Sequence, residues 1–379
     1  MFLVAAEASG DALGADLIDA LRQEQPDVRL SGVGGGKMAS RGVPSLVDTG
    51  GLAVLGLIDG VKAFGRVKQK VKEVADAIVR ADPDAVVLID SWGFMWRVAR
   101  ELKLRGLRAR RIKLIGPQVW ATRPGRARVL AEWCDHLLCI HAFEQPFYER
   151  WGLPTTVIGN PALGRVHQGD GARFRADHAV AAGQTVIGLL PGSRPSEIHR
   201  VAPVLVEAAR ELCRKDPQRL VVCVVAPSIE PELRALSSSW TFPYLLVIAE
   251  EDKSDAFAAM EVALACSGTV TTELAAQGAA IVVGYRLGWV TWAIARAFLM
   301  RARFITLLNV AANKEVAPEF VQTRFTASNL ARAAERLLSD PEALASQRSD
   351  QRAALKKMAG PERPAASIAA ETVLRLAAG

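Results

Sequence analysis

The sequence predicts an α/β protein with two Rossmann-like domains, each built on a doubly wound parallel sheet, and three observations support this fold class. Apolar runs of strand length alternate with helical patterns along the 379 residues. These runs are nearly continuous in Val, Ile and Leu, as expected for strands that are covered on both faces. The runs also fall into two series, separated by residues 164–184, where glycines and charges replace the apolar periodicity.

The expected strands follow one another in chain order, with helical patterns between them. The first series is Phe2–Glu7, Arg29–Gly34, Ala85–Asp90, Ile112–Gly116, His136–Ile140 and Thr156–Ile158. The second series is Val186–Leu190, Leu220–Ala226, Tyr244–Ala249, Val262–Cys266 and Ile281–Tyr285. We therefore expect an N-terminal domain over residues 1–164, a C-terminal domain over residues 185–350 and a linker between them.

The formal net charge of +7 suits an anionic partner such as a nucleotide, a nucleic acid or a membrane headgroup layer, and charge alone does not choose among them. The first residues run directly into a strand pattern without a signal peptide, which predicts a cytoplasmic protein. The apolar stretches Val262–Tyr285 and Leu287–Met300 are interrupted by Glu273 and Arg296. We therefore expect no transmembrane helix.

Five cysteines in a chain without a secretion signal are expected to be reduced thiols. One cluster resembles a metal-ligand set in composition, namely Cys134, His136, Cys139 and His141. Strand alternation places His136 on the opposite face from Cys139 and His141, which favours buried strand positions over zinc ligands. We therefore expect no metal and no cofactor.

The segment Glu7-Ala8-Ser9-Gly10-Asp11 follows the first strand and precedes an apolar helical pattern. Small residues at such a turn let backbone amides and the start of a helix approach a ligand. The alternative is that Ser9 or Asp11 caps the helix. The residues alone leave both interpretations open.

Two motifs in the C-terminal half point to a nucleotide diphosphate. In Pro191-Gly192-Ser193-Arg194, the arginine can bind two phosphate oxygens at once, although a tight turn with an exposed arginine is the alternative. The motif lacks the lysine and the spacing of a P-loop. In Ser267-Gly268-Thr269, hydroxyl and backbone donors suit a phosphate, and Glu273 suits a ribose hydroxyl pair. The pair of motifs is more specific than either alone.

Asp90 ends an apolar strand and is followed by Ser91, Trp92 and Gly93. A carboxylate at a strand end beside an aromatic side chain is suited to act as a general base. An ordinary helix-capping aspartate is the alternative, and the residues alone favour it.

These motifs, in this order, resemble the lipid-A-disaccharide synthase family, and the resemblance covers nearly the whole chain. The matching segments are Ala6–Asp11 with Leu13–Ala15, Gly32–Gly35, Pro117–Ala121, Leu189–Arg194, Ser267–Thr269 with Glu273, Val282–Arg286, Leu308–Asn309 and Pro318–Glu319. Together they are much more specific than any one motif.

The resemblance implies a GT-B glycosyltransferase, with two facing Rossmann-like domains and a C-terminal helix, about residues 361–379, that packs back on the first domain. It implies inverting transfer of 2,3-diacylglucosamine from its UDP derivative to 2,3-diacylglucosamine 1-phosphate, which gives a β-1,6 disaccharide and UDP without a metal ion. By position, Asp90 is similar to the catalytic aspartate of the family. The expected ligand contacts are Arg194, Ser267, Gly268, Thr269, Glu273, Ser9 and Gly10.

The chain departs from the family pattern in three places. Trp92-Gly93-Phe94-Met95 stands where the family usually has proline, aspartate, phenylalanine and asparagine or threonine. Leu55-Gly56 and Asp59 stand where the family usually has a methionine-glycine pair and a glutamate. Gly159-Asn160-Pro161 stands where glycine-histidine-proline is common. These departures bear on acceptor preference and rate more than on the reaction class.

Both implied sugar substrates carry acyl chains, so we expect the protein to contact the cytoplasmic face of the inner membrane without spanning it. Leu52–Ile58 is apolar, and Lys62, Arg66, Lys68, Lys70 and Lys72 follow it. Apolar residues beside cations suit acyl chains and anionic headgroups. The alternative for the helix is core packing through Val67, Val71, Val74 and Ile78 with a solvated basic face. Trp289 and Trp292 are a second candidate, with core or homodimer packing as the alternative.

Three other functions compete with this interpretation. A UDP-N-acetylglucosamine 2-epimerase shares the architecture and the donor nucleotide, but it has no need of an apolar and basic lipid surface. The departure at Trp92 and Gly93 suggests a UDP-sugar-binding relative that has lost catalysis. Nucleic-acid binding is not expected, because the basic residues are not interleaved with aromatics in a recognisable module.

Overall fold

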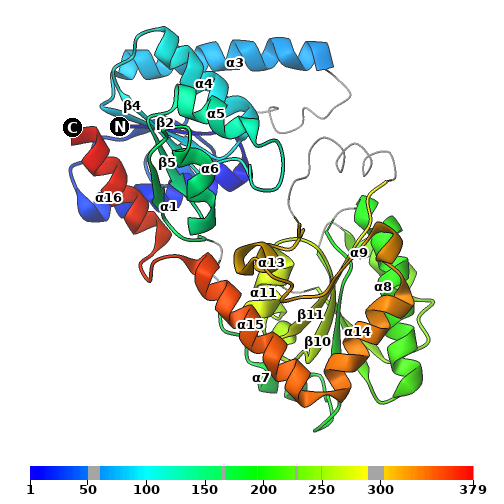
Figure 1. The fold of residues 1–379 in the computed structure, drawn as a ribbon. Helices are drawn as coiled ribbons and strands as arrows, with labels where there is room; N and C mark the ends of the chain where they lie inside the picture. Colours follow the sequence, from blue (N-terminus) through cyan, green and yellow to red (C-terminus); the bar gives the residue numbers. More distant parts are fainter. Residues whose placement is uncertain are drawn as a thin grey trace. The chain divides into compact units, whose positions relative to one another are not determined.

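The computed structural model of the chain describes residues 1–49, 60–161, 163, 167–193, 195–226, 229–248, 250–288 and 303–378 (Figure 1). It consists of two compact units. The first unit comprises Met1–Gly164 and Ala359–Gly379, and the second comprises Arg165–Met358.

The first unit is built on a six-stranded parallel sheet with the order β2-β1-β3-β4-β5-β6. Its strands are β1 (Phe2–Ala5), β2 (Ser31–Val33), β3 (Ala85–Ile89), β4 (Arg110–Leu114), β5 (His136–Cys139) and β6 (Thr155–Val157). The central strands β1 and β3 are buried along their whole length. This burial explains why they appear in the sequence as continuous apolar runs.

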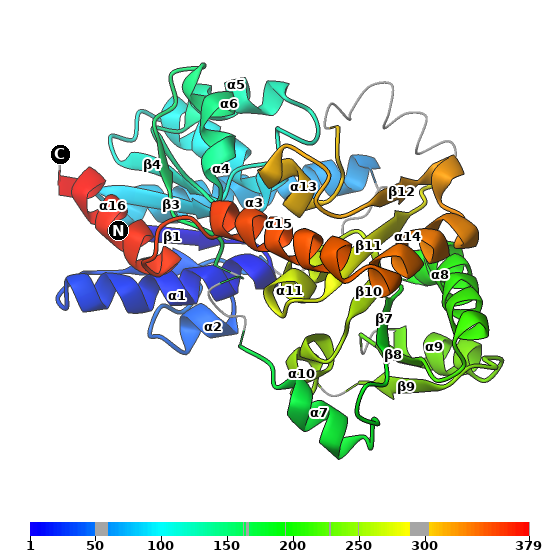
Figure 2. The same cartoon turned by 60° about the horizontal axis from the view of Figure 1, so that its bottom comes forward.

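Helices cover both faces of this sheet, as Figure 2 shows. One face packs against α1 (Ala8–Glu24), α2 (Gly36–Ala39) and the C-terminal α16 (Ala365–Ala378). The other face packs against α3 (Gly60–Ala81), α4 (Trp92–Leu104) and α5 (Gly125–Trp133). The short helices η1 (Ala142–Glu144) and α6 (Gln145–Glu149) follow β5.

The helix α3 resolves one alternative that the sequence left open. Val71, Val74 and Ile78 are buried in the core of the first unit, whereas Arg66 and Lys72 are exposed. The helix therefore packs through its apolar face and presents its basic face to solvent. The predicted lipid-contact residues 52–58 lie outside the described residues, as do Trp289 and Trp292.

The second unit is built on another six-stranded parallel sheet, with the order β12-β11-β10-β7-β8-β9. Its strands are β7 (Val186–Leu190), β8 (Leu220–Val224), β9 (Tyr244–Val247), β10 (Val262–Cys266), β11 (Ala280–Tyr285) and β12 (Glu319–Val321). One face packs against α8 (Pro195–Lys215) and α14 (Ala327–Ser339). The remaining helices are α7 (Gly171–Asp177), α9 (Glu230–Ser237), α10 (Lys253–Ala258), α11 (Val270–Ala276), α13 (Leu307–Ala312), η5 (Gln322–Arg324) and α15 (Pro341–Ala359).

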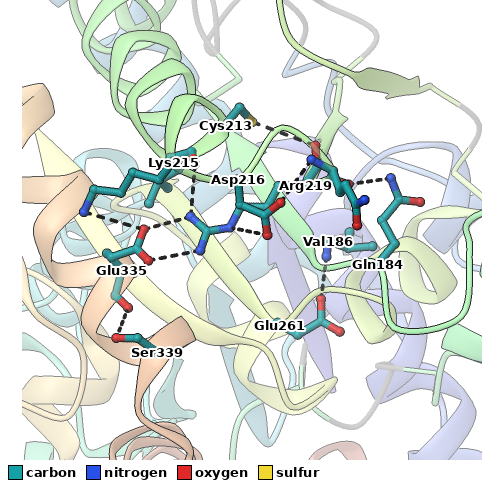
Figure 3. A network of polar contacts seen from close by, with 11 residues as sticks. Gln184, Val186, Cys213, Lys215, Asp216, Arg219, Glu261, Glu335 and Ser339 are labelled. Atoms are coloured by element: carbon teal, nitrogen blue, oxygen red, sulfur yellow. Dashed lines mark hydrogen bonds and ion pairs between the residues drawn. The ribbon is translucent and has the colours of Figure 1, made fainter.

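The amino ends of these strands form an edge with paired charges, shown in Figure 3. Arg219, just before β8, donates to both carboxylate oxygens of Glu335 on α14, at 2.8 and 3.0 Å. Glu261, just before β10, accepts a hydrogen bond of 2.6 Å from the backbone N–H of Val186 and forms an ion pair of 2.7 Å with Arg175. These contacts fasten helices and strand starts to one another.

The predicted fold class is confirmed, and each expected strand overlaps an observed one. The prediction that residues 164–184 form a linker is wrong for its greater part. This segment contains α7, whose N-cap Asp170 accepts from the backbone N–H of Arg173 at 2.9 Å. The backbone N–H of Gly169 also donates to Gln277 at 2.9 Å, so the segment is folded onto the second unit. Within the described ranges, every helix is too short or too polar to cross a lipid bilayer.

Candidate active site

The turn after β3 has an unusual backbone. Asp90 and Ser91 have φ angles of 50° and 38°, so two consecutive residues other than glycine adopt the left-handed region. Such a conformation costs on the order of 1–3 kcal/mol for each residue and is concentrated at functional sites. The turn lies at the carboxyl edge of the first sheet, the edge formed by the carboxyl ends of its parallel strands.

Two side-chain hydrogen bonds join this turn to the one after β1. Ser9 Oγ donates to Asp90 Oδ2 at 2.9 Å, and Ser91 Oγ donates to Glu7 Oε1 at 2.8 Å. Asp90 is half-buried and Ser9 is exposed. The structure therefore brings together Ser9 and Asp90, which the sequence singled out separately, and leaves the carboxylate accessible from solvent.

Neither Ser9 nor Asp11 caps α1, so that alternative is wrong. The N-cap of α1 is Glu7, which forms no capping hydrogen bond. The buried Asp11 instead accepts backbone N–H bonds from Gly35, Lys37 and Met38, at 2.8 to 3.0 Å. Asp11 therefore holds the start of α2 against α1. Gly10 is buried, but an added Cβ would lie 3.5 Å from the carbonyl oxygen of Ile89, an ordinary contact, so the packing here does not require glycine.

A buried lysine forms hydrogen bonds to the backbone of the Asp90 turn. Lys113 on β4 is 1% exposed, and its Nζ donates to the carbonyl oxygens of Asp90, Leu88 and Leu114, at 2.5, 3.1 and 3.1 Å. Burial lowers the pKa of Lys113 to about 8, although the charge of Asp90 opposes this shift. Sequence reasoning missed this residue. The available signal was a lysine within a strand that is otherwise expected to be buried.

The ends of β4 and β5 carry a second group of buried polar atoms. Tyr148 Oη donates to the carbonyl oxygen of Pro117 at 2.5 Å and so fixes the start of the Pro117–Ala121 motif. Glu144 is 5% exposed, and burial raises its pKa to about 8, despite a backbone hydrogen bond from His141 that lowers it. Glu144 therefore carries a proton at neutral pH. It too was missed from the sequence.

The turn after β7 in the second unit is tight. Gly192 has a φ angle of 111°, and an added Cβ would lie 2.4 Å from Glu197 Oε2. The same carboxylate oxygen accepts from the backbone N–H of Ser193 at 3.0 Å. Glycine is therefore required at this position. The predicted diphosphate ligand Arg194 lies outside the described residues.

The turn after β10 lies beside the turn after β7, because these two strands pair in parallel. Ser267 is half-buried and forms a long hydrogen bond of 3.4 Å with the carbonyl oxygen of Ile305. Gly268 and Thr269 are exposed. Their backbone and hydroxyl groups are thus available to a ligand at the carboxyl edge of the second sheet.

Glu273 on α11 is engaged by a neighbouring cation. Its Oε2 forms an ion pair of 2.7 Å with Lys253 Nζ, which also contacts Glu250 at 3.3 Å. Burial alone would lower the pKa of Lys253, but its bonds to Glu273 and Glu250 outweigh burial and raise it. Glu273 lies in the first turn of α11, the helix that begins directly after residues 267–269.

The Leu308–Asn309 and Pro318–Glu319 segments form a buried hydrogen-bond network. The Glu319 carboxylate accepts from the backbone N–H groups of Ile305 and Thr306 and from Asn309 Nδ2, with the shortest bonds at 2.8 Å. Asn309 Oδ1 accepts from the backbone N–H of Val316 at 2.7 Å. The network fixes residues 305–306 beside Ser267. Nearby, the buried hydroxyl groups of Thr272 and Thr306 have no hydrogen-bond partner among the described residues.

The family comparison explains this combination of motifs. A family model described as Lipid-A-disaccharide synthetase matches residues 1–373. The chain belongs to the lipid-A-disaccharide synthase family. The lipid-A-disaccharide synthase of Rhodospirillum centenum is 39% identical over 345 residues, which cover 90% of this chain and 86% of the relative. That of Gluconobacter oxydans is 37% identical over 377 residues, which cover 99% and 90%.

Solved structures place this family member in a wider fold group. Acinetobacter baumannii MurG gives a TM-score of 0.60 at 14% identity, and the match covers 99% of each chain. The UDP-N-acetylglucosamine 2-epimerase of Neisseria meningitidis, bound to UDP-N-acetylglucosamine, gives 0.56 at 14% identity and covers 99% of this chain and 98% of that one. At this identity the likeness shows the GT-B fold alone. The fold and the family membership together establish a glycosyltransferase, and the epimerase alternative is not favoured.

Proposed function

We propose that this chain transfers 2,3-diacylglucosamine from UDP-2,3-diacylglucosamine to 2,3-diacylglucosamine 1-phosphate, with inversion and release of UDP. The observation that carries the proposal is the Asp90 carboxylate, held in a left-handed turn and accepting a hydrogen bond of 2.9 Å from Ser9. A carboxylate held in this way is suited to take the proton of an acceptor hydroxyl.

The chemistry proceeds in a single displacement. The 6-hydroxyl of the acceptor gives its proton to Asp90 while its oxygen attacks the anomeric carbon of the donor. The bond from that carbon to the diphosphate breaks, and UDP leaves with the electron pair. The bond from Ser9 orients the carboxylate, and Lys113 holds the backbone of the same turn. The inverted β-1,6 linkage follows because attack and departure occur on opposite faces of the sugar.

We assign the donor nucleotide to the second unit. Ser267, Gly268 and Thr269 offer backbone and hydroxyl donors for the diphosphate at the end of β10. Arg194, which follows β7 in the sequence, is proposed to supply positive charge that stabilises the departing UDP. Glu273 accepts from the ribose hydroxyls through Oε1, since Lys253 contacts Oε2. Gly10 lies next to Ser9 in the first turn of α1, and its backbone stays a predicted ligand contact in the first unit.

Because both sugars carry acyl chains, we further propose that the protein works at the cytoplasmic surface of the inner membrane. The exposed basic face of α3, which includes Arg66, Lys68 and Lys72, suits anionic headgroups. Reversing these charges to glutamate should weaken binding to anionic vesicles, and the wild-type binding should fade as salt rises. Binding that is insensitive to both changes would remove α3 from the membrane contact.

The deciding experiment is incubation of the purified chain with the acylated UDP-sugar and the lipid acceptor, read by mass spectrometry. We expect the disaccharide and UDP in equal amounts. UDP-sugar binding without either product would indicate a relative that has lost catalysis. Conversion of UDP-N-acetylglucosamine to its 2-epimer would indicate an epimerase instead.

A further inference from the structure

A cluster of arginine and tryptophan side chains lies at the carboxyl edge of the first sheet, next to the Asp90 turn. We call Trp92, Trp96, Arg123 and Arg126 the arginine–tryptophan cluster. The tryptophans are on α4, which begins directly after Ser91, and the arginines follow the adjacent strand β4. The two indole rings stack with centroids 6.3 Å apart, and Arg126 Cζ lies 5.5 Å from the centroid of Trp92.

Arg126 is a half-buried cation without an anionic partner in the described part of the chain. Its side chain forms no hydrogen bond or ion pair with any described residue and contacts the Trp92 ring. Burial lowers the pKa of Arg126, and the neighbouring charge of Arg123 lowers it further. A partly desolvated charge without a counter-ion is unfavourable for the free protein.

Three other arginines that are buried or half-buried differ in this respect. Arg111 donates to Asp135 at 2.8 Å, and Arg219 donates to Glu335 at 2.8 Å. Arg175 pairs with Glu261 at 2.7 Å. Since the fold supplies carboxylates to these arginines and not to Arg126, the anion for Arg126 is expected to come from a ligand.

We propose that Arg126, assisted by Arg123, binds the phosphate monoester of the lipid-linked acceptor sugar. This inference rests on the proposed function, because it assumes an acceptor that carries a phosphate. A guanidinium can bind two phosphate oxygens at once, and the Trp92 ring lies against the guanidinium, with Arg126 Cζ 5.5 Å from its centroid. Trp92 follows the proposed base by two residues, and we place on this cluster the phosphate of an acceptor whose hydroxyl lies at Asp90.

The indole rings suit the rest of the same ligand. Trp92 and Trp96 are half-buried and combine an apolar face with a polar N–H group. Such side chains fit the boundary between a phosphosugar headgroup and its acyl chains. Trp92, which departs from the family pattern, is therefore expected to contribute to acceptor binding.

The test is a cycle of two changes, one in the protein and one in the acceptor. The rate is measured with 2,3-diacylglucosamine 1-phosphate and with 2,3-diacylglucosamine that lacks the phosphate, for the wild type, Arg126→Ala and Arg126→Lys. For the wild type, removal of the phosphate should lower kcat/KM about 10–100-fold, the usual effect of losing a charged hydrogen bond. Arg126→Ala should cause a loss of similar size with the phosphorylated acceptor and little further loss without the phosphate. Arg126→Lys should recover part of the loss.

The control variant is Arg128→Ala, an exposed arginine on the same helix, which should affect both acceptors equally and weakly. Unchanged UDP affinity and thermal midpoint establish that Arg126→Ala is folded. Equal losses of Arg126→Ala on both acceptors would overturn the proposal. A loss of binding to phosphatidylglycerol vesicles with unchanged acceptor discrimination would also overturn it and would assign Arg126 to the headgroup layer.

A second measurement separates this inference from the proposed function. Equilibrium binding of the two acceptors in detergent micelles is measured by calorimetry for the wild type and for Arg126→Ala. If no disaccharide forms but the wild type prefers the phosphorylated acceptor and Arg126→Ala does not, the site stands and the proposed function fails. If disaccharide forms but neither protein discriminates between the acceptors, the site fails and the proposed function stands.

Discussion

Charge is arranged in opposite ways at the amino edge of the second sheet and at the carboxyl edge of the first. At the amino edge, Arg219 is 9% exposed and binds both oxygens of Glu335, so its charge is balanced within the fold (Figure 3). At the carboxyl edge, Arg126 has no described counter-ion, and Asp90 accepts one hydroxyl bond in a strained turn.

The difference separates groups that hold the fold together from groups that serve a ligand. A buried charge that finds its partner inside the chain stabilises a particular packing. A charge that stays unbalanced, or a backbone held in a left-handed turn, is unfavourable for the fold and persists where chemistry uses it. Substitutions at the two edges should therefore affect different properties, namely stability at the amino edge and turnover or binding at the carboxyl edge.

The largest expected effect is on turnover. Asp90→Asn should lower kcat by about 10²–10⁴-fold, the usual range for the loss of a general base, while UDP affinity and the thermal midpoint stay unchanged. The amide keeps the size of the side chain and can still accept the bond from Ser9, but it cannot take a proton at neutral pH. Steady-state kinetics and calorimetry with UDP measure the two effects.

The matched control is Ser9→Ala, which removes the bond of 2.9 Å but keeps the carboxylate. It should lower kcat about tenfold, as expected for the loss of one hydrogen bond of roughly 1.4 kcal/mol. If Asp90→Asn turns over at the wild-type rate while chemistry limits the reaction, the base is another group and the proposed mechanism is wrong.

The next effect is on stability. Arg219→Ala leaves Glu335 without its bidentate partner and should lower the free energy of unfolding by about 3 kcal/mol. Lys215→Ala is the control, because Lys215 approaches the same carboxylate only at 3.9 Å and is 61% exposed, so its removal should cost about 0.5 kcal/mol or less. Urea unfolding measures both. Equal losses in the two variants would remove the distinction between the paired edge and the exposed surface.

A third variant, Lys113→Met, tests whether a buried charge at the carboxyl edge serves the turn. It removes three hydrogen bonds that hold β3, β4 and Asp90, and we expect kcat to fall by about 10–100-fold with little change in the KM for the donor. A merely structural role would instead change stability and leave kcat of the folded fraction unchanged.

The pH dependence of the wild type provides an independent readout for Lys113. Its pKa falls from 10.5 in the unfolded chain to about 8 in the folded one, so the unfolded chain binds more protons between these values. Its contribution to stability therefore rises with pH over this window. Turnover should fall as pH rises through about 8, where Lys113 of the folded chain loses its proton, because a neutral amine has two N–H groups for three carbonyl oxygens. Lys113→Met should remove both pH dependences. A wild-type turnover that rises with pH together with stability would contradict the assignment.

The strands could be predicted from the sequence because a parallel strand buried on both faces leaves a continuous apolar run. The exception is β12, which has three residues at the sheet edge and begins with the network residue Glu319. The role of Asp11 could not be predicted, because its partners Gly35, Lys37 and Met38 lie on a separate helix that only tertiary packing brings to it.

The site residues that belong to sequence motifs were predicted, whereas the residues whose chemistry depends on burial were missed. Asp90 and Ser9 belong to sequence motifs, and the fold places them 2.9 Å apart. Lys113 and Glu144 are ordinary ionisable residues in sequence, and their pKa values shift because the surrounding elements exclude water. A window of neighbouring residues does not contain that information.

The smallest expected effect concerns Glu273, which combines both kinds of charge, because it is paired with Lys253 and is also proposed to bind a ligand. Glu273→Gln should weaken UDP binding about fivefold to tenfold, as expected for one hydrogen bond to a neutral hydroxyl. Binding of a diphosphate without uridine should be unaffected, since the ribose contact is absent there. Lys253→Met is the control, because it frees the carboxylate without removing it and should change UDP affinity less than Glu273→Gln does. If both variants weaken the binding of UDP and of the uridine-free diphosphate equally, Glu273 has a structural role in the turn after β10. Its charge would then be balanced within the fold, as that of Arg219 is.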